Sequence, residues 1–329
     1  MQAQNLKMLH PGSEPYGVFK IEVIGKMSQE LMSCISGGRV IMHRYFLLFV
    51  VFVAVAAINA GDMLYYGLVE FRRGNMPVII TIPHGGKSKP DHIKDRTKDI
   101  LTLDTFSMEY AMATYDSLCK WTGRSPYLVI SHLHRIKADM NRDSANATEG
   151  DSTAFAAWKV FHDAISRACE EVTGKFGRGH IFDMHTCRTL VEHIDVGQRW
   201  NRAVLMKTNE ELNASDSLNN ISSIKSLAGF HNKTISELVR GPESFGAILE
   251  KHGVAALPSP ARPKPFDDVL YFPGGYDIIK HGSGSGGTID ATQIEVPKMK
   301  MRDSSYAKKL PSALARSIIA FMKRWYGMT

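Results

Sequence analysis

The sequence predicts an α/β protein with a mainly parallel central sheet and helices on both of its faces. Two observations support this fold class. Short apolar runs rich in β-branched residues alternate along the chain with longer runs in which apolar residues recur at helical spacing. This alternation is typical of a parallel sheet, because its crossover connections are helices that cover it. With 329 residues, the chain is long enough for one large domain with a well-buried core.

Four apolar runs predict buried strands, at residues 78–82, 127–130, 180–184 and 292–296. Four segments predict helices, at residues 104–121, 151–172, 242–252 and 310–325. We expect the first helix to begin with Asp104 or Thr105 as its N-cap and to end at Gly123. Residues 206–236 are polar and rich in Asn and Ser, which predicts a surface excursion rather than a second domain.

The N-terminal part of the chain carries a targeting signal. Met42-His43-Arg44 precedes an apolar run at residues 45–57, and Ala60 supplies a small residue directly before Gly61. This order is typical of a secretory signal peptide, and the run is shorter than the roughly 20 residues that span a membrane. We therefore expect an unstructured leader or a misassigned start at residues 1–41, a signal peptide at 42–60 and a single catalytic domain at 61–329. The protein is expected to be secreted, or anchored in a membrane by residues 45–60 if they are not cleaved.

Other features agree with an extracellular protein. Four sequons predict N-glycosylation, at Asn146, Asn213, Asn220 and Asn232. Three cysteines follow the signal peptide, and Cys119, Cys169 and Cys187 allow one disulfide and one odd thiol, with the pairing left open. The formal net charge of +7 is modest and dispersed. Its densest basic run, at residues 298–309, predicts a solvated loop or helix start rather than a nucleic-acid site. We expect a monomer that binds no nucleic acid.

Three polar motifs are each associated with the end of an apolar run: Pro83-His84-Gly85-Gly86, Arg135-Ile-Lys-Ala-Asp-Met-Asn-Arg142 and Phe182-Asp183-Met184-His185. Strand ends are where open α/β sheets build their sites. His84 and His185, together with an acid, are the ligand types of a mononuclear zinc hydrolase. Asp183 and His185 are two apart in an extended run and point the same way. Asp183, and Asp139 in the second motif, are expected to hold the ligating imidazoles in place.

Carboxylates are the candidates for the third ligand and for proton transfer. Asp104 and Glu109 both suit the metal, and each also has a purely structural role, as a helix cap or as an acid near a helix N-terminus. Glu295 lies inside an apolar strand, where an unpaired carboxylate is costly, so it needs a partner or a function. We expect it to be the general base and acid, unless it forms a salt bridge with an arginine such as Arg142 or Arg135.

The second motif has an alternating pattern. Arg135, Lys137, Asp139 and Asn141 would lie on one face of an extended segment, a pattern that a solvated edge strand usually explains. Here Arg142 follows directly. An Asn-Arg pair suits a substrate carboxylate, because arginine offers a planar fork and asparagine adds a neutral donor.

Taken together, the motifs resemble the N-formylglutamate amidohydrolase family, a distant relative of the zinc carboxypeptidases and of aspartoacylase. The resemblance runs from about Val78 to Phe321 and adds Gly274-Gly-Tyr276 and Ile289-Asp-Ala-Thr-Gln-Ile-Glu295 to the three motifs above. One departure is Lys87, which stands where the carboxypeptidase-like relatives carry a glutamate three residues after the first histidine.

The resemblance implies a mixed central sheet flanked by helices, as in the zinc carboxypeptidases, with one zinc ion at the strand ends. It implies that His84, His185 and an acid of the segment 104–109 bind this zinc, and that Asn141 and Arg142 hold a substrate carboxylate. It further implies that Arg135 polarises the scissile carbonyl, that Glu295 activates the zinc-bound water and that Tyr276 closes over the substrate.

We therefore expect a secreted zinc amidohydrolase that cleaves the amide bond of an N-acyl amino acid or of a small peptide with a free carboxylate. A carboxypeptidase-like peptidase is the alternative with the same chemistry. A non-catalytic secreted protein that keeps the fold to bind a partner is the alternative from another class. Such a protein would have no need of His84, His185, Arg142 and Glu295 together.

Overall fold

The structure is a computed structural model, and it describes residues 62–64, 67–266 and 269–329. Residues Gly61–Thr329 belong to one structural unit. The expected leader at 1–41 and signal peptide at 42–60 lie outside the described residues. In the part of the chain that is described, no helix has both the length and the apolar character needed to cross a membrane.

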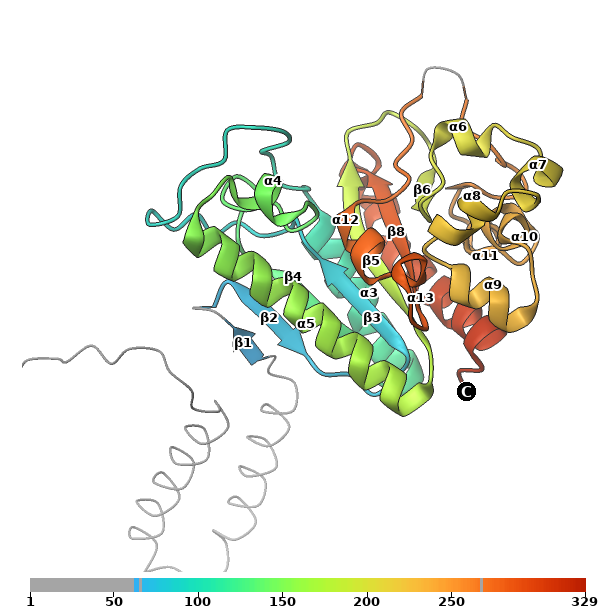
Figure 1. The fold of residues 1–329 in the computed structure, drawn as a ribbon, viewed down its shortest axis with the longest axis horizontal. Coiled ribbons are helices and arrows are strands. Elements are labelled where there is room, and N and C mark those ends of the chain that lie inside the picture. Colours follow the sequence, from blue (N-terminus) through green and yellow to red (C-terminus); the bar gives the residue numbers. More distant parts are fainter. Residues whose placement is uncertain (1–61, 65–66, 267–268) are drawn as a thin grey trace, which may run out of the picture. The chain divides into compact units, whose positions relative to one another are not determined.

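A mixed sheet forms the centre of this unit, with the strand order β1-β2-β4-β3-β5-β8-β6-β7 (Figure 1). Its strands are β1 (Asp62–Leu64), β2 (Val69–Arg72), β3 (Val78–Ile82), β4 (Tyr127–Ser131), β5 (Gly179–Cys187), β6 (Ile194–Gly197), β7 (Ala256–Leu257) and β8 (Ile289–Pro297). The middle strands β4, β3, β5 and β8 are parallel, whereas β2 and β6 run antiparallel to β4 and β8. The predicted fold class, a mixed and mainly parallel sheet, is confirmed.

The middle strands form from the predicted apolar runs, and side chains on both of their faces are buried. In β3, Ile80 and Ile82 belong to one hydrophobic cluster and Ile79 to another, as the alternation of side chains along a strand requires. The first cluster contains residues of α3 (Ser107–Thr122), α11 (Phe245–Lys251) and α13 (Ser304–Tyr326). The second contains residues of α5 (Ser152–Phe176), which crosses the sheet in Figure 1. Helices therefore cover both faces of the sheet.

The predicted helices correspond to α3, α5, α11 and α13, with shifted ends. Helix α3 begins later than expected: its N-cap is Phe106, and neither Asp104 nor Thr105 caps it. Asp104 is therefore available for another role. Gly123 ends α3 as predicted, in a left-handed conformation with φ of 64° that glycine adopts without strain.

Two sequence-based expectations about local structure are wrong. Residues 206–236 form the helices α7 (Asn209–Asn213), α8 (Asp216–Ile221), α9 (Lys225–His231) and the start of α10 (Ile235–Arg240). Their residues Leu212 and Leu227 lie in the first cluster, so this segment is part of the core and not an excursion. The sequence shows no clear helical spacing of apolar residues in this segment, because each of these short helices buries few of them.

The second motif is not extended either. It forms turns after β4, in which the Lys137 N–H donates to the His134 carbonyl and the Asn141 N–H donates to Asp139 Oδ1. The side chain of Lys137 therefore does not join those of Arg135, Asp139 and Asn141. Its Nζ instead binds the Ile93 carbonyl and Asp95. The remaining helices are α4 (Ser144–Thr148), α6 (Arg202–Leu205) and α12 (Tyr276–His281), with short 3-10 turns at Ser283–Ser285 and Lys300–Arg302.

Candidate metal centre and active-site pocket

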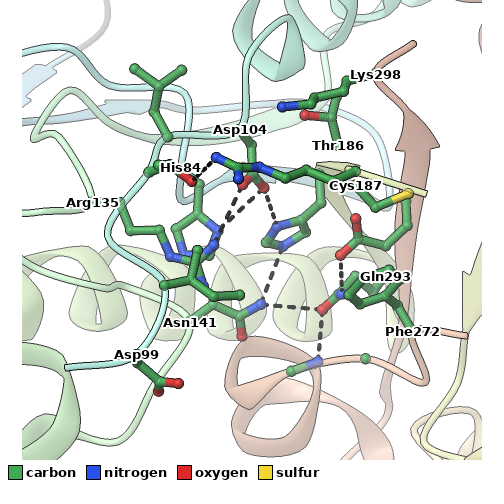
Figure 2. A pocket seen from close by; sticks show the side chains of 18 of the residues that line it. His84, Asp99, Asp104, Arg135, Asn141, Thr186, Cys187, Phe272, Gln293 and Lys298 are labelled. Atoms are coloured by element: carbon green, nitrogen blue, oxygen red, sulfur yellow. Dashed lines mark hydrogen bonds and ion pairs between the residues drawn. The ribbon is translucent and has the colours of Figure 1, made fainter. Parts of the chain in front are cut away.

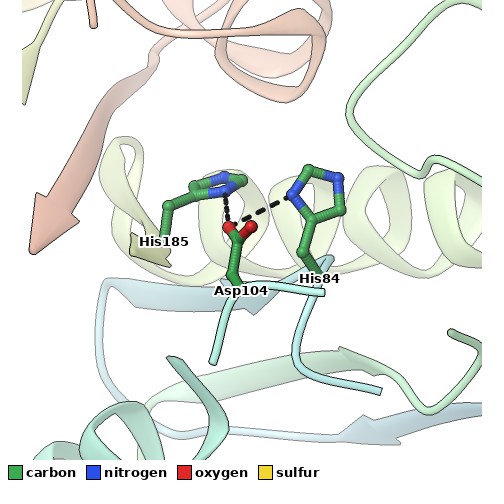
Figure 3. Close-up of side chains that lie close together, drawn as sticks. All are labelled: His84, Asp104 and His185. Carbon is green, nitrogen blue, oxygen red and sulfur yellow. Dashed lines mark hydrogen bonds and ion pairs between the residues drawn. The ribbon is translucent and has the colours of Figure 1, made fainter. Parts of the chain in front are cut away.

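Three buried side chains meet at the carboxyl ends of the parallel strands. His84 follows β3 by two residues, and His185 lies near the end of the neighbouring strand β5. Asp104 comes from the loop before α3, where its N–H donates to the His84 carbonyl at 3.0 Å. One ligand atom of each residue lies within 4.8 Å of the others (Figure 3). The structure thus brings Asp104, and not Glu109, to the two histidines.

The two imidazoles present the same nitrogen to the shared carboxylate. Asp104 Oδ2 lies 3.0 Å from His185 Nδ1 and 3.3 Å from His84 Nδ1. The opposite nitrogen of each ring has its own buried acid: His84 Nε2 is 2.7 Å from Asp139 Oδ1, and His185 Nε2 is 2.8 Å from Asp183 Oδ2. Histidines that bind a metal commonly have this second partner, which fixes the ring. Two imidazole nitrogens and one carboxylate oxygen fit a divalent metal such as zinc.

Negative charge is concentrated around the centre. Burial favours the neutral acids, yet His84, together with His185 at Asp104 and with Arg135 at Asp139, outweighs it and holds the pKa values of both acids well below their usual range. Burial also opposes charge on His185, but Asp183 and Asp104 raise its pKa well above the usual value. Arg135 supplies a fixed cation, with Nε 2.8 Å from Asp139 Oδ2 and Nη1 3.4 Å from Asp104 Oδ1. The donors therefore form a site that attracts a further positive charge.

Glu295 lies on β8 and is the register partner of His185 on β5. It is buried, and its Oε1 accepts a hydrogen bond of 2.8 Å from Gln293 Nε2. Its Oε2 is buried without a hydrogen-bond partner among the described residues. The salt bridge considered as an alternative is not formed, because Arg135 and Arg142 pair with other acids. Burial raises the pKa of Glu295 to about 8, against the effect of His185.

The neighbouring residues Asn141 and Arg142 lie in different surroundings. Arg142 is half-buried at the pocket, and its Nε lies 3.0 Å from Asp99 Oδ2. Asn141 is buried, with Nδ2 3.2 Å from both Gln293 Oε1 and His185 Nε2. Its Oδ1 accepts from the Asp277 N–H at 2.8 Å. The amide of Asn141 is thus occupied by the protein itself and links α12 to the centre.

Other predicted residues lie away from the centre. Glu109 is exposed and pairs with Lys87 across 3.6 Å. Tyr276 does not line the pocket, and its ring instead packs near Trp158 and His162. The four sequon asparagines, Asn146, Asn213, Asn220 and Asn232, are all exposed.

The centre and Glu295 line a cavity of about 640 Å³. Figure 2 shows side chains that surround this cavity, among them His84, Asp104 and Gln293. Most of its other lining residues were not predicted from the sequence, among them the polar or charged residues Gln293, Arg188 and Lys298. Gln293 precedes Glu295 by two residues, so strand alternation could have placed both on one face. Arg188 and Lys298 each follow a site residue by three positions, and nothing in the pattern distinguishes them from other surface cations.

Comparison with known proteins gives structural matches only. No model of a known protein family and no curated protein matches the sequence. A gene product from Agrobacterium tumefaciens aligns with 83% of this chain and 94% of its own, at 12% identity and a TM-score of 0.43. The N-formylglutamate amidohydrolase from Ralstonia eutropha JMP134 aligns over 78% of this chain and 98% of its own, also at 12% identity and a TM-score of 0.43.

A candidate metallopeptidase from Shewanella amazonensis SB2B aligns over 88% of this chain and 94% of its own, at 9% identity and a TM-score of 0.36. One of these neighbours thus bears the name of the family that the sequence motifs resemble. Similarity at this level carries no argument about activity, which has to come from the site.

Proposed function

We propose that this protein is a zinc-dependent amidohydrolase that cleaves the amide bond of a small N-acylated substrate with a free carboxylate. One observation carries the proposal. The three donors His84, Asp104 and His185 line the same cavity as Glu295, whose Oε2 is buried without a hydrogen-bond partner among the described residues. A buried carboxylate oxygen without a partner is unfavourable in a purely structural role.

Each residue of the site has a separate task. A zinc ion held by His84, Asp104 and His185 would supply Lewis-acid chemistry, polarising the amide carbonyl and making water acidic near neutral pH. Asp139 and Asp183 keep the histidine Nε2 atoms protonated and so direct Nδ1 toward the centre. Glu295 accepts a proton from the attacking water at Oε2 and returns it to the leaving nitrogen.

The substrate is held by cations around the cavity. Arg135 lies beside Asp104 and donates to the carbonyl oxygen as negative charge develops there. Arg142, together with Arg188 and Lys298, provides positive charge for the substrate carboxylate. Asn141 acts by positioning Gln293 and α12, because its own amide is already hydrogen-bonded to them.

Metal analysis of the purified protein tests the centre. We expect about one zinc per chain, lost in Asp104→Asn and retained in Glu109→Gln. The second variant is the matched control, since Glu109 is an exposed acid of the same stretch of chain. Zinc retained by Asp104→Asn, or lost from Glu109→Gln, would refute this ligand set.

A rate measurement tests the chemistry. In the zinc-loaded protein, Glu295→Gln should lower kcat for N-acyl amino acid hydrolysis about 10²–10⁴-fold, the range associated with general acid–base catalysis. Its zinc content should stay unchanged, because Glu295 is not a ligand. Full activity in this variant would remove Glu295 from the mechanism, and no hydrolysis by the zinc-loaded parent would favour a binding protein.

We further propose that the mature protein is secreted and glycosylated. Support comes from the signal-peptide pattern at 42–60 and from the exposure of the four sequon asparagines. Sequencing of the mature N-terminus should give a start at or near Gly61, and treatment with an N-glycosidase should lower the mass. A start upstream of residue 45 would instead mean an uncleaved anchor.

A further inference from the structure

The lining of the active-site cavity contains a set of apolar side chains beside its polar and charged ones. This apolar set consists of Ile100, Leu101, Leu103, Leu270, Phe272 and Pro273. These side chains come from two loops, one before α3 and one before α12, which contribute to the same cavity. Two distant segments thus supply hydrocarbon to one opening.

Two of these side chains are exposed to an unusual degree. The exposed fraction is 46% for Ile100 and 61% for Leu270. Single exposed apolar residues need no explanation, but apolar side chains that line one cavity are typical of a ligand-binding site. The walls therefore favour a ligand with a hydrocarbon part that covers them.

The size of the cavity leads to the same conclusion. Its volume of about 640 Å³ lies within the range of roughly 300–1,000 Å³ found for sites that take drug-sized ligands. A formyl group is a single carbon with its oxygen and would leave most of this volume unfilled. The cavity has room for a longer group that extends from the scissile carbonyl.

We propose that the acyl group of the substrate is a medium-length aliphatic chain that lies against the wall of Ile100, Leu101, Leu103, Leu270, Phe272 and Pro273. The inference rests on the proposed function, because it takes the scissile amide to lie at the centre. The carboxylate end of the substrate stays with the cations described above, so the substrate is amphiphilic. Each methylene that this wall buries improves binding about fourfold.

The test is a binding series of N-acyl glutamates from formyl through acetyl, butanoyl and hexanoyl to octanoyl. Titration calorimetry on the zinc-loaded Glu295→Gln protein gives their affinities without turnover, and kcat/KM on the parent protein gives their reactivity. We expect affinity to rise about 100-fold or more from acetyl to octanoyl. Leu270→Ser and Ile100→Ser should each weaken octanoyl-glutamate about fivefold to tenfold and leave the formyl compound unchanged.

Leu190→Ser is the matched control, because Leu190 is 82% exposed but does not line the cavity. It should bind the whole series as the parent protein does. Affinity that is flat or falls with chain length would overturn the inference, even if the formyl compound is hydrolysed and the proposed function stands. Chain-length-dependent binding without hydrolysis by the parent would instead refute the proposed function and leave the acyl site in place.

Discussion

Each histidine of the centre uses its two ring nitrogens for different partners. The Nε2 atoms of His84 and His185 bind the buried acids Asp139 and Asp183, and this bond decides which nitrogen keeps the proton. Both Nδ1 atoms face Asp104, and they are the nitrogens that would bind the proposed metal. The two acids are themselves held in place, because Thr81 donates to Asp183 at 2.7 Å and Arg135 donates to Asp139 at 2.8 Å.

The sequence was sufficient to identify most of this arrangement residue by residue. His84 and His185 follow apolar strands, and strand ends of a parallel sheet converge. The third ligand remained open between Asp104 and Glu109, because the choice depends on where α3 begins. Sequence propensity suggested Asp104 as its cap, but the backbone of Asp104 is bound to His84 and the helix begins three residues later.

The buried acid Asp290 lies outside the metal centre, and we expect it to make the stability of the fold depend on pH. It accepts hydrogen bonds from Ser283, Tyr326 and the Leu227 N–H, yet burial raises its pKa to about 6. In the folded state the Asp290 carboxyl therefore keeps its proton to a higher pH than in the unfolded chain, where its pKa is near 3.9. Asp290 therefore lowers stability as pH rises from about 4 to 6, by up to about 3 kcal/mol.

The variant Asp290→Asn should lack this contribution, because a neutral amide can keep all three contacts by donating to the Tyr326 hydroxyl. Urea unfolding at pH 4, 5, 6 and 7 should show the variant gaining stability relative to the parent as pH rises. Asp216→Asn changes an exposed acid and should run parallel to the parent. A constant offset between Asp290→Asn and the parent across this range would contradict the prediction.

At the scale of elements, the loop that follows β3 packs closely against the end of β4, and this contact holds His84 in place. Ser88 forms a bridge with Leu133, and its N–H donates to the His132 carbonyl at 2.9 Å. Gly86 allows this approach, because a Cβ there would lie 2.3 Å from the carbonyl carbon of His132 and 2.6 Å from the Leu133 oxygen. Backbone atoms cannot yield as a flexible side chain can.

Gly86→Ala should therefore lower the free energy of unfolding by about 1–3 kcal/mol and weaken zinc binding, since His84 is two residues away. Gly174→Ala is the matched control. A Cβ at Gly174, inside α5, meets nothing within 4 Å, so alanine there should raise stability by about 0.5–1 kcal/mol. Urea unfolding should show that the free energy of unfolding changes with opposite sign in the two variants. Equal changes would show that the close approach at Gly86 does not affect stability.

The elements also show where sequence reasoning is sufficient and where it is not. Strands β3, β4, β5 and β8 are buried on both faces. In β3 and β4 this burial appears as a nearly continuous apolar run that can be recognised alone, whereas β5 and β8 also carry the polar residues of the site. The outer strands β2, β6 and β7 are short, and β6 (Ile-Asp-Val-Gly) contains an acid and a glycine. Their identity depends on pairing with β4 and β8, which is tertiary information that a local pattern does not contain.

For the whole molecule, the centre links metal binding to stability. Only the folded sheet brings His84, Asp104 and His185 together, so the proposed zinc would bind the native state and stabilise it by mass action, by about 4 kcal/mol at 1,000 times the Kd. Thermal unfolding should shift upward by several degrees with zinc and return with a chelator. His185→Ala should show no such shift, and an equal shift in that variant would mean that zinc acts elsewhere.

The order of the strands along the chain has a consequence for the protein during its synthesis. All three proposed ligands precede residue 186, whereas Glu295 lies on β8, which joins the exposed side of β5 only later. A ribosome-bound chain that has just released β5 already contains every atom that would hold the metal, but not the group that would move the proton. Premature termination between β5 and β8 would therefore yield a polypeptide with the ligands of a metalloprotein and without its acid–base group.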